Sequence, residues 1–561
     1  MHQEKGIWVS AEELNRDEAF LQSTQKEFSV ENIAETDGQW TANRRDFLKM
    51  MGFGLGAATI AASCEIPMKR AIPYVTKPDE IVPGVANYFA SSFVQGGDYC
   101  AVLVKTREGR PIKIEGNTLS KVTKGGTSAR AQAVVLSLYD TRRIKSAGSV
   151  EKGEFSGMNW TDLDKKITGQ LALGGQIRII SGTNISPTAK KALGEFIAKY
   201  PNTRVVTYDP VSSAALLAAN EQCFGLKALP SYHFDKAEVI VSLGADFLGT
   251  WISPVEYARA YAERRKISDP KKAAMSRHYQ VESHMSLTGS NADHRVLIKP
   301  SEMGAAICAL YNEVAALTGG ASIGGPKVND KAAKALKSAA RDLVAAKGKS
   351  LVVSGSNNIA EQVIVNKIND LLANLNATVD FGTLSYQRQG DEREMERLIG
   401  EMSAGQVAIA MVWGANPAFD LPNADKFKAA FAKVNTRVSF SGTMDETTAL
   451  CNYSAPTHHL LESWGDAQPK EGHYSLIQPT IAPLFDTRQA ELSLLIWAGS
   501  PNLNLQDPQP YYQYLKSAWT GDLHAKQSKY SPVAFWEMSL HDGIFEAPGA
   551  GRTVSYNSGA T

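Results

Sequence analysis

Two apolar segments of the chain each occur twice, and this duplication constrains the fold more than any other feature. Residues 179–184 (IISGTN) recur as residues 352–357 (VVSGSN), at an offset of 173 residues. Residues 239–246 (VIVSLGAD) recur as residues 409–416 (IAMVWGAN), at an offset of 170 residues. Because two separate segments repeat at nearly the same offset, the sequence indicates an internal duplication of one structural unit.

Each repeated segment has the pattern of a buried strand that ends at a glycine, and a helical pattern follows, as in residues 187–197. Strands alternating with helices predict doubly wound parallel sheets. Such sheets bind ligands beyond the carboxyl ends of their strands, where the repeats place Gly182, Gly244, Gly355 and Gly414. These glycines fit either a nucleotide-like cofactor held by backbone amides or ordinary tight turns, and no GxGxxG or Walker motif decides between them.

Composition and residue patterns divide the chain into six consecutive parts. They are a leader with a helix (1–43), a twin-arginine signal (44–63), an N-terminal β-rich region (64–170), a first α/β unit (171–320), a second α/β unit (321–500) and an extended C-terminal arm (501–561). A glycine-rich linker at 318–326 sets the boundary between the two units. A chain path in which the two units interleave is left open.

The N-terminal part carries an export signal. Arg44 and Arg45 precede Phe47, Leu48 and Lys49, and the thirteen residues 50–62 that follow are uncharged. This pattern indicates a twin-arginine signal, and its apolar run is shorter than the roughly 20 residues that span a bilayer. We therefore expect export of the folded chain to the periplasmic face of the inner membrane. A core helix that happens to follow two arginines is the alternative.

Cys64 directly follows the small residues 61–63 (AAS) at the end of this signal. The arrangement resembles a bacterial lipoprotein cleavage site, so we expect Cys64 to be acylated and to anchor the mature chain to a membrane. A chance cysteine beside a cleavage site is the alternative. Residues 1–43 carry nine acidic and three basic residues and include a capping box at 10–13 (SAEE), which we interpret as a recognition helix for a maturation factor.

Charge and cysteine spacing exclude several classes of function. The 59 Lys and Arg residues against 58 Asp and Glu leave a net charge of +1, which argues against nucleic acid as a partner. The five cysteines are too widely spaced for CxxC zinc sites or for the cysteine runs that hold iron–sulfur clusters. They are Cys64, Cys100, Cys223, Cys308 and Cys451.

The densest group of reactive side chains is His458, His459, Glu462 and Asp466. These residue types can bind metals or move protons, but their spacing matches no common ligand set. We favour a hydrogen-bonded loop that packs on a neighbouring domain. The sequence therefore assigns no catalytic, cofactor-binding or metal-binding residue.

Several motifs within residues 90–500 occur in the order found in the molybdopterin oxidoreductase superfamily. They are 108–110 (EGR), 115–117 (EGN), 138–143 (LYDTRR), 241–246 (VSLGAD), 292–297 (ADHRVL), and 456–462 (PTHHLLE) with 478–479 (QP) after it. Together with the leader segment 7–14 (IWVSAEEL), they most resemble the molybdopterin-like half of the B subunit of alternative complex III. The resemblance implies a multidomain α/β fold with two related doubly wound parallel-sheet units and a small N-terminal β-rich region.

The chain departs from this superfamily where active members bind metals. Only Cys100 remains of the cluster cysteines, and Ser128 stands where the last one would be. A molybdenum ligand is expected ahead of residues 224–225, where only Ser212 and Ser213 are available, so a serine ligand stays open. The resemblance implies no cofactor in this chain and iron–sulfur clusters in the family's ferredoxin-like half or a partner. The chain stops where that half would begin, so it is a separate half or its sequence ends early.

The resemblance thus implies a non-catalytic scaffold subunit of a quinol-oxidising respiratory complex that passes electrons to cytochrome c or an oxidase. The implied partners are membrane subunits, a multihaem cytochrome c, an iron–sulfur ferredoxin-like domain and the lipid membrane. Two alternatives remain. One is an active molybdopterin oxidoreductase for a small oxyanion or sulfur compound, with Ser212 or Ser213 on the metal. The other is a periplasmic solute-binding lipoprotein.

Overall fold

The computed structural model describes residues 82–560, except residues 83, 268 and 273. The chain divides into two compact units, Met1–Pro78 and Asp79–Thr561, and every described helix and strand belongs to the second. Within the part described, no helix is both long and apolar enough to cross a membrane. The expected export and lipidation residues lie outside the described residues: Arg44, Arg45, Phe47, Leu48, Lys49 and Cys64.

The N-terminal β-rich region is an antiparallel sheet of three strands in the order β1-β2-β3. Its elements are β1 (Asn87–Gln95), β2 (Asp98–Arg107), β3 (Arg110–Gly116) and the adjoining helix α4 (Ala129–Ser137). Strands β2 and β3 form an antiparallel hairpin. Strand β1 was not predicted, because the buried Ser91 and Ser92 interrupt its apolar pattern, yet it pairs with β2 over its whole length.

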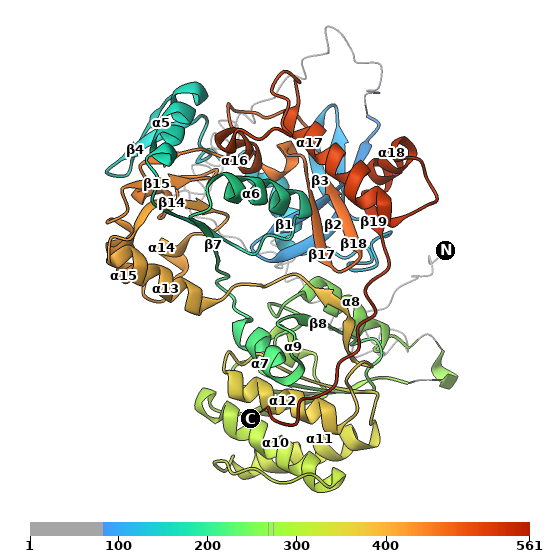
Figure 1. The fold of residues 1–561 in the computed structure, drawn as a ribbon. Helices are drawn as coiled ribbons and strands as arrows, with labels where there is room; N and C mark the ends of the chain where they lie inside the picture. The colour runs from blue at the N-terminus through green and yellow to red at the C-terminus, as the bar shows by residue number, and fades with distance from the viewer. Residues whose placement is uncertain (1–81, 83, 268, 273, 561) are drawn as a thin grey trace, which may run out of the picture. The chain divides into compact units, whose positions relative to one another are not determined.

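A larger sheet has seven strands in the order β5-β4-β16-β15-β14-β6-β7 (Figure 1). The strands from β16 to β7 are parallel, and helices cover both faces. Alternate residues enter opposite cores, since Ile179 and Met411 pack with α5, α6 and α16, whereas Ile180 and Val412 pack with α13 and α15. The strands are β4 (Gly148–Glu151), β5 (Glu154–Gly157), β6 (Gln176–Ser181), β7 (Thr203–Thr207), β14 (Val407–Trp413), β15 (Thr436–Ser439) and β16 (Tyr453–Ser454). The helices are α5 (Trp160–Ala172), α6 (Pro187–Lys199), α13 (Glu392–Ser403), α14 (Pro417–Asp420), α15 (Ala424–Phe431) and α16 (Ala490–Ala498).

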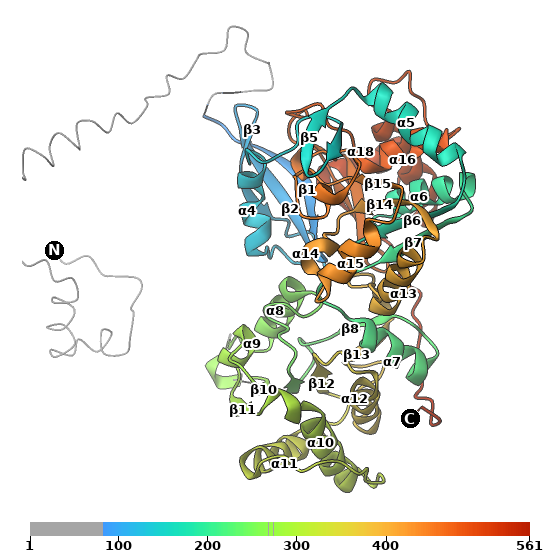
Figure 2. The ribbon, with the colours of Figure 1, turned by 90° about the vertical axis from the view of Figure 1, so that its left-hand side faces the viewer.

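A second parallel sheet has four strands in the order β11-β10-β9-β12. Helices α10, α11 and α12 pack on one face of it, and α7 and α8 pack on the other (Figure 2). The strands are β9 (Val239–Leu243), β10 (Arg277–Glu282), β11 (His294–Leu297) and β12 (Ser350–Ser354). The helices are α7 (Ala214–Phe224), α8 (Pro254–Glu263), α9 (Leu287–Ser290), α10 (Met303–Thr318), α11 (Asp330–Ala345) and α12 (Ile359–Leu371).

The repeated segments pair across the expected boundary at residue 320. Strand β6 lies beside β14 in the seven-stranded sheet, and β9 lies beside β12 in the four-stranded sheet. Each of these pairs therefore joins one strand from before residue 320 to one strand from after it. The repeated glycines are needed because these strand ends approach closely. A Cβ on Gly182 would lie 2.8 Å from the carbonyl oxygen of Gly414, and one on Gly355 would lie 2.4 Å from that of Gly244.

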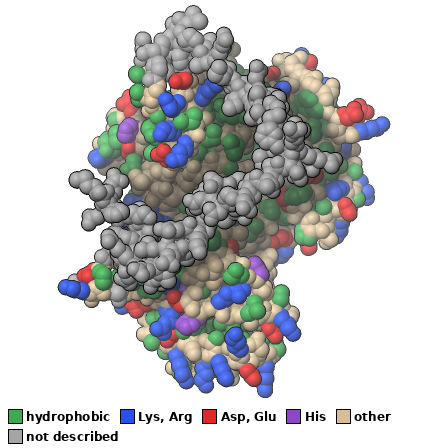
Figure 3. All heavy atoms as spheres, turned by 180° about the vertical axis from the view of Figure 1, so that it is seen from behind, with side chains coloured by type: hydrophobic (Ala, Val, Ile, Leu, Met, Phe, Trp, Pro, Cys, Tyr) green, Lys and Arg blue, Asp and Glu red, His purple; other side chains and the backbone are tan. Residues whose placement is uncertain are grey.

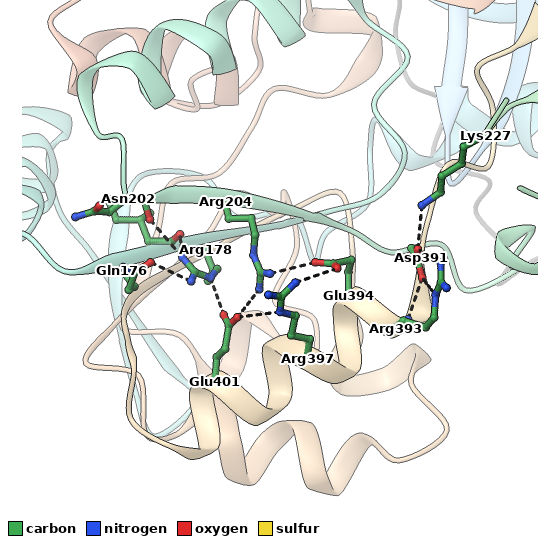
Figure 4. Close-up of polar contacts among 11 residues, drawn as sticks. Gln176, Arg178, Asn202, Arg204, Lys227, Asp391, Arg393, Glu394, Arg397 and Glu401 are labelled. Atoms are coloured by element: carbon green, nitrogen blue, oxygen red, sulfur yellow. Dashed lines mark hydrogen bonds and ion pairs between the residues drawn. The ribbon is translucent and has the colours of Figure 1, made fainter. Parts of the chain in front are cut away.

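Ion pairs fix α13 to the edge of the seven-stranded sheet (Figure 4). Glu401 on α13 accepts from Arg178 Nε on β6 and from Arg204 Nη2 on β7, each at 2.8 Å. Arg204 also reaches Glu394, about two turns earlier on the helix, at 3.1 Å. Arg178 and Glu401 are largely buried, so this network supplies polar partners to groups that the helix removes from water.

An antiparallel sheet of five strands, β19-β18-β17-β13-β8, joins segments that lie far apart in the sequence. Its strands are β8 (Leu229–Tyr232), β13 (Val379–Ser385), β17 (Gly465–Lys470), β18 (His473–Ile477) and β19 (Ile544–Glu546). The C-terminal segment, expected to be an extended arm, instead forms α17 (Pro510–Ala518), α18 (Pro532–Asp542) and β19. The reason is burial of its aromatic residues, which complete two small cores: Tyr511, Tyr514, Trp519, Phe535 and Trp536.

Candidate functional site

A cavity of about 880 Å³ opens at the carboxyl ends of the strands of the seven-stranded sheet. Its lining includes Gly182 after β6, Tyr208 after β7, Gly414 after β14 and Phe440 after β15. From β6 the chain proceeds to β7 on one side, and from β14 it proceeds to β15 on the other side, so the strand order reverses between β6 and β14. Such a switch point is where open α/β sheets bind ligands.

Further walls come from other parts of the chain. They are the end of β1 with the turn after it (93–97), α4 and its C-terminal extension (130–143), Arg388, residues 457–466, Ile477 on β18, and Gln489 and Glu491 at the start of α16. The cavity is therefore assembled by the N-terminal sheet and the seven-stranded sheet together. Arg388 adopts a left-handed backbone conformation, with a φ of 54°, and is 5% exposed.

Three arginines line the cavity, and each forms an ion pair with a carboxylate. Arg130 Nη2 lies 2.6 Å from Asp98, and Arg388 Nη2 lies 3.5 Å from the same carboxylate. Arg143 forms a two-pronged pair with Glu462, with donor–acceptor distances of 2.6 and 3.1 Å. Arg130 and Arg388 share one carboxylate, so Asp98 and Glu462 together offset two of the three positive charges.

Six carboxyl groups line the same cavity: Asp140, Asp209, Asp420, Asp445, Asp466 and Glu491. Asp209 accepts hydrogen bonds from Thr183 N (3.0 Å) and Oγ1 (2.5 Å) and from Gly390 N (2.8 Å). An excess of carboxyl groups over arginines does not favour a ligand that carries phosphate, because phosphate sites need uncommitted cations or free backbone amides.

Glu491 and Asp466 are two acidic residues of the cavity that influence each other; Asp466 is buried and Glu491 is half-buried. Asp466 accepts from Ser186 Oγ, from Thr188 N and Oγ1, and from Trp519 Nε1 (2.9 Å), and its burial raises the pKa of the carboxyl. Burial, together with the nearby Asp466, raises the pKa of Glu491 to about 7. Glu491 is therefore a group whose charge changes near neutral pH.

The His458–Asp466 segment, singled out by the sequence, lies at the cavity wall as a hydrogen-bonded loop that leads into β17. His459 Nε2 lies 2.9 Å from Ser137 Oγ on α4, and His458 Nδ1 lies 2.6 Å from Thr487 Oγ1. Burial lowers the pKa of His458, and lowers that of His459 to about 4, so both rings are neutral at pH 7. Across the described ranges, no three His, Cys, Asp or Glu side chains are arranged to hold a metal ion.

The described cysteines do not supply the ligands of an iron–sulfur cluster, which takes four cysteine thiolates. Cys100 is buried in β2 and hydrogen-bonds with Ser128, and its burial raises the pKa of the thiol. The other three lie elsewhere: Cys223 packs in a core on α7, Cys308 lies on α10, and Cys451 packs against α13 and α15. Ser128 also caps α4 by accepting from Ala131 N at 3.1 Å.

The structure places Ser212 and Ser213 just outside the cavity lining, which ends at Val211. Ser212 Oγ accepts from Ala214 N at 3.0 Å, and the buried Ser213 precedes α7. Neither serine is thus among the residues that face the cavity. Sequence reasoning missed Arg388, Asp209 and Glu491, because only the tertiary fold brings them to this site.

Comparison with known proteins places these features in context. No family model matches the sequence. The chain is 26% identical, over 453 residues, to the menaquinone reductase, molybdopterin-binding-like subunit of Nitratidesulfovibrio vulgaris. The match covers 72% of this chain and 64% of the relative, so the chain spans less than two thirds of that protein's length.

The fold is similar to that of acetylene hydratase from Pelobacter acetylenicus, with a TM-score of 0.57. The two structures share 10% sequence identity, and the match covers 82% of this chain and 74% of the other. At this identity the likeness concerns the fold alone. It confirms the predicted α/β architecture with parallel sheets.

Proposed function

We propose that the chain, which is similar in sequence to a molybdopterin-binding-like subunit and in fold to acetylene hydratase, belongs to the molybdopterin-oxidoreductase-like superfamily and is a non-catalytic scaffold subunit of a membrane-associated respiratory complex that oxidises quinol. The similarity to a subunit of a menaquinone reductase supports a place in a quinone-linked electron-transfer complex. The activity then belongs to the complex, and this chain contributes the surface on which other subunits assemble.

The observation that carries the proposal is the composition of the cavity at the strand switch point. Its three arginines are each paired with a carboxylate, and six carboxyl groups face the space. The cysteines among the described residues are dispersed over separate parts of the fold. In our proposal the fold was retained after the metal ligands were lost, and the chain holds neither molybdenum nor molybdopterin.

The proposed partners supply the redox groups. They are an iron–sulfur ferredoxin-like half or subunit, a multihaem cytochrome c and membrane subunits, as in alternative complex III. The twin-arginine signal and Cys64 support a location at the periplasmic face of the inner membrane, with an acyl anchor at the cysteine. Nucleic acid is not among the proposed partners.

The name of the relative and our proposal differ in the direction of electron flow. Its name is that of a reductase of menaquinone, whereas we propose oxidation of quinol. Both directions use the same kind of complex, so quinol oxidation and quinone reduction must be measured on one sample to tell them apart.

The test is to isolate the complex from membranes through an affinity tag on this chain and to identify the proteins that co-purify. We expect iron–sulfur, haem and membrane subunits together with quinol oxidation. Replacing both Ser212 and Ser213 by alanine should leave that activity unchanged, because neither side chain faces the cavity. Loss of turnover in this variant would favour an active molybdopterin enzyme, and recovery of the chain without membrane partners would favour a solute-binding lipoprotein.

A further inference from the structure

A row of basic side chains runs along the outer face of α11. Lys331, Lys334, Lys337 and Arg341 are all exposed and follow one another at intervals of three, three and four residues. This spacing places them on one side of a helix, and at 1.5 Å per residue the row is about 15 Å long. Lys327, before the helix, and Lys347, after it, are also exposed; we call these six residues the basic row.

The opposite face of α11 is buried in the core on the four-stranded sheet. The buried residues are Ala332, Leu336, Ala339, Ala340 and Leu343. The helix is therefore fixed in place by packing, and its basic side chains are not needed to hold it. Because like charges three or four residues apart repel each other, the row also reduces the stability of the helix.

No carboxylate among the described residues lies within 4.0 Å of a nitrogen of the basic row. Neighbouring cations differ in this respect, since Lys349 pairs with Glu238 at 3.4 Å and Arg277 pairs with Asp342 at 2.8 Å. Figure 3 shows Lys and Arg side chains gathered at the end of the molecule where α10 and α11 lie in Figure 1. In a chain with a net charge of +1, this concentration produces a local positive potential.

We propose that the basic row holds this face of the protein against the anionic phospholipid headgroups of a membrane. Five of its six residues are lysines, and the other exposed positions of α11 are Asp330, Ala333, Ser338 and Ala345, with no aromatic or large apolar side chain. Protein–protein interfaces are depleted in lysine and enriched in aromatic residues. Clusters of four to eight basic residues on a helix are, by contrast, typical of contact with anionic lipids.

This inference rests on the proposed membrane association and adds an electrostatic contact to the acyl anchor at Cys64. Several weak membrane signals together anchor a protein more firmly than one. The contact would orient the four-stranded sheet, with its helices α10 and α11, toward the membrane surface. Its strength should fall with salt, because exposed charges are screened within about 10 Å at 0.1 M ionic strength.

The test uses the full chain produced without acylation, so that Cys64 cannot anchor it. Co-sedimentation is measured with vesicles of phosphatidylcholine alone and with vesicles that also contain phosphatidylglycerol. We expect binding only to the anionic vesicles and its loss at high salt. The variant K331E/K334E/K337E/R341E should bind at least about tenfold more weakly, since each basic residue near an anionic surface contributes about fivefold in affinity.

A control with the same change in charge is K165E/K166E/K199E/K426E, whose residues are exposed on α5, α6 and α15 and have no ion-pair partner among the described residues. It should bind the anionic vesicles about as well as the natural chain, apart from the general effect of charge. If the reversed row impairs folding, the glutamine version of the same four positions provides the comparison.

Equal binding to both kinds of vesicle would overturn the inference, as would equal losses in the row and control variants. A row variant that keeps vesicle binding but loses a protein partner would also overturn it, since that result identifies an acidic protein as the occupant. A chain that co-purifies with membrane subunits yet ignores anionic vesicles would leave the proposed function standing and refute this inference alone.

Discussion

At the scale of single residues, the cavity is held together by charges that the protein pairs internally. Arg143 and Glu462 come from segments 319 residues apart and are almost fully buried. Arg143 also donates to the carbonyl oxygen of Leu138, at 2.8 Å, and Glu462 accepts from Leu484 N, at 3.0 Å. The pair therefore joins the end of α4 to the loop that carries the two histidines.

Removing one partner of this pair should destabilise the protein strongly. Glu462→Leu leaves a buried guanidinium without its carboxylate, which costs about 3–5 kcal/mol in comparable cases. Replacing both residues, as in R143M/E462L, should recover much of that loss. Thermal and denaturant unfolding of the natural chain and of these two variants measures the change in stability. The neighbouring Arg142→Met is the control, because the Arg142 side chain is 83% exposed and its loss should leave unfolding unchanged; an equal effect of both single variants would contradict this account.

The pKa of Glu491 gives a second prediction at this scale. Its folded-state pKa is raised to about 7, so the folded protein binds a proton that the unfolded chain has already released between about pH 4.5 and 7. Ionisation of Glu491 should therefore reduce stability progressively as the pH rises through this window. Glu491→Gln, which cannot ionise, should match the natural chain at pH 4.5 and melt at a higher temperature at pH 8.

The matched control is Glu396→Gln, which removes an exposed carboxyl on α13. It should show no such dependence on pH. A melting-temperature difference for Glu491→Gln that stays constant from pH 4.5 to 8 would show that Glu491 does not titrate in this window.

At the scale of elements, the repeated glycines allow the ends of two paired strands to approach each other closely in each of the two parallel sheets. Gly182 follows β6 and Gly414 follows β14, and their backbones meet at the cavity. In the four-stranded sheet, Gly355 and Gly244 meet in the same way at the ends of β12 and β9. A side chain at these positions would push the two strand ends apart.

Gly182→Ala should accordingly destabilise the seven-stranded sheet. The new Cβ would lie 2.8 Å from the carbonyl oxygen of Gly414, which belongs to rigid backbone, and overpacking of this kind costs about 1–3 kcal/mol. Gly169→Ala on α5 is the control, because nothing lies within 4 Å of its Cβ and alanine is favoured in a helix by about 0.5–1 kcal/mol. Unfolding experiments should thus move the two variants in opposite directions; a neutral Gly182→Ala would remove the close-approach argument.

At the scale of the whole molecule, the sequence predicted the fold class but not the path of the chain. The duplicated segments identified β6, β9, β12 and β14 as strands and placed their glycines at the carboxyl ends. Which copy pairs with which depends on long-range contacts that leave no local pattern, so the exchange of strands across residue 320 could only be left open. The C-terminal helices were missed because the prolines and polar residues near Tyr511 resemble a loop until the aromatic side chains are buried.

The candidate site was predictable only in part. Its position followed from the strand ends, and the loop at His458 and His459 was expected to be held by hydrogen bonds. The ion pairs of the cavity arginines were not predictable, because Arg130 and Arg388 both reach Asp98 from segments far apart in the sequence. The group of six carboxyls likewise forms only in the folded chain, because Asp140, Asp209, Asp420, Asp445, Asp466 and Glu491 come from separate segments.

The most direct test of the central claim is the molybdenum content of the complex, measured per copy of this chain on a sample whose quinol oxidation is assayed at the same time. If the fold is a scaffold that has lost its metal ligands, an active sample contains iron but only trace molybdenum and no releasable pterin. Molybdenum at close to one atom per chain in the active sample would contradict the account.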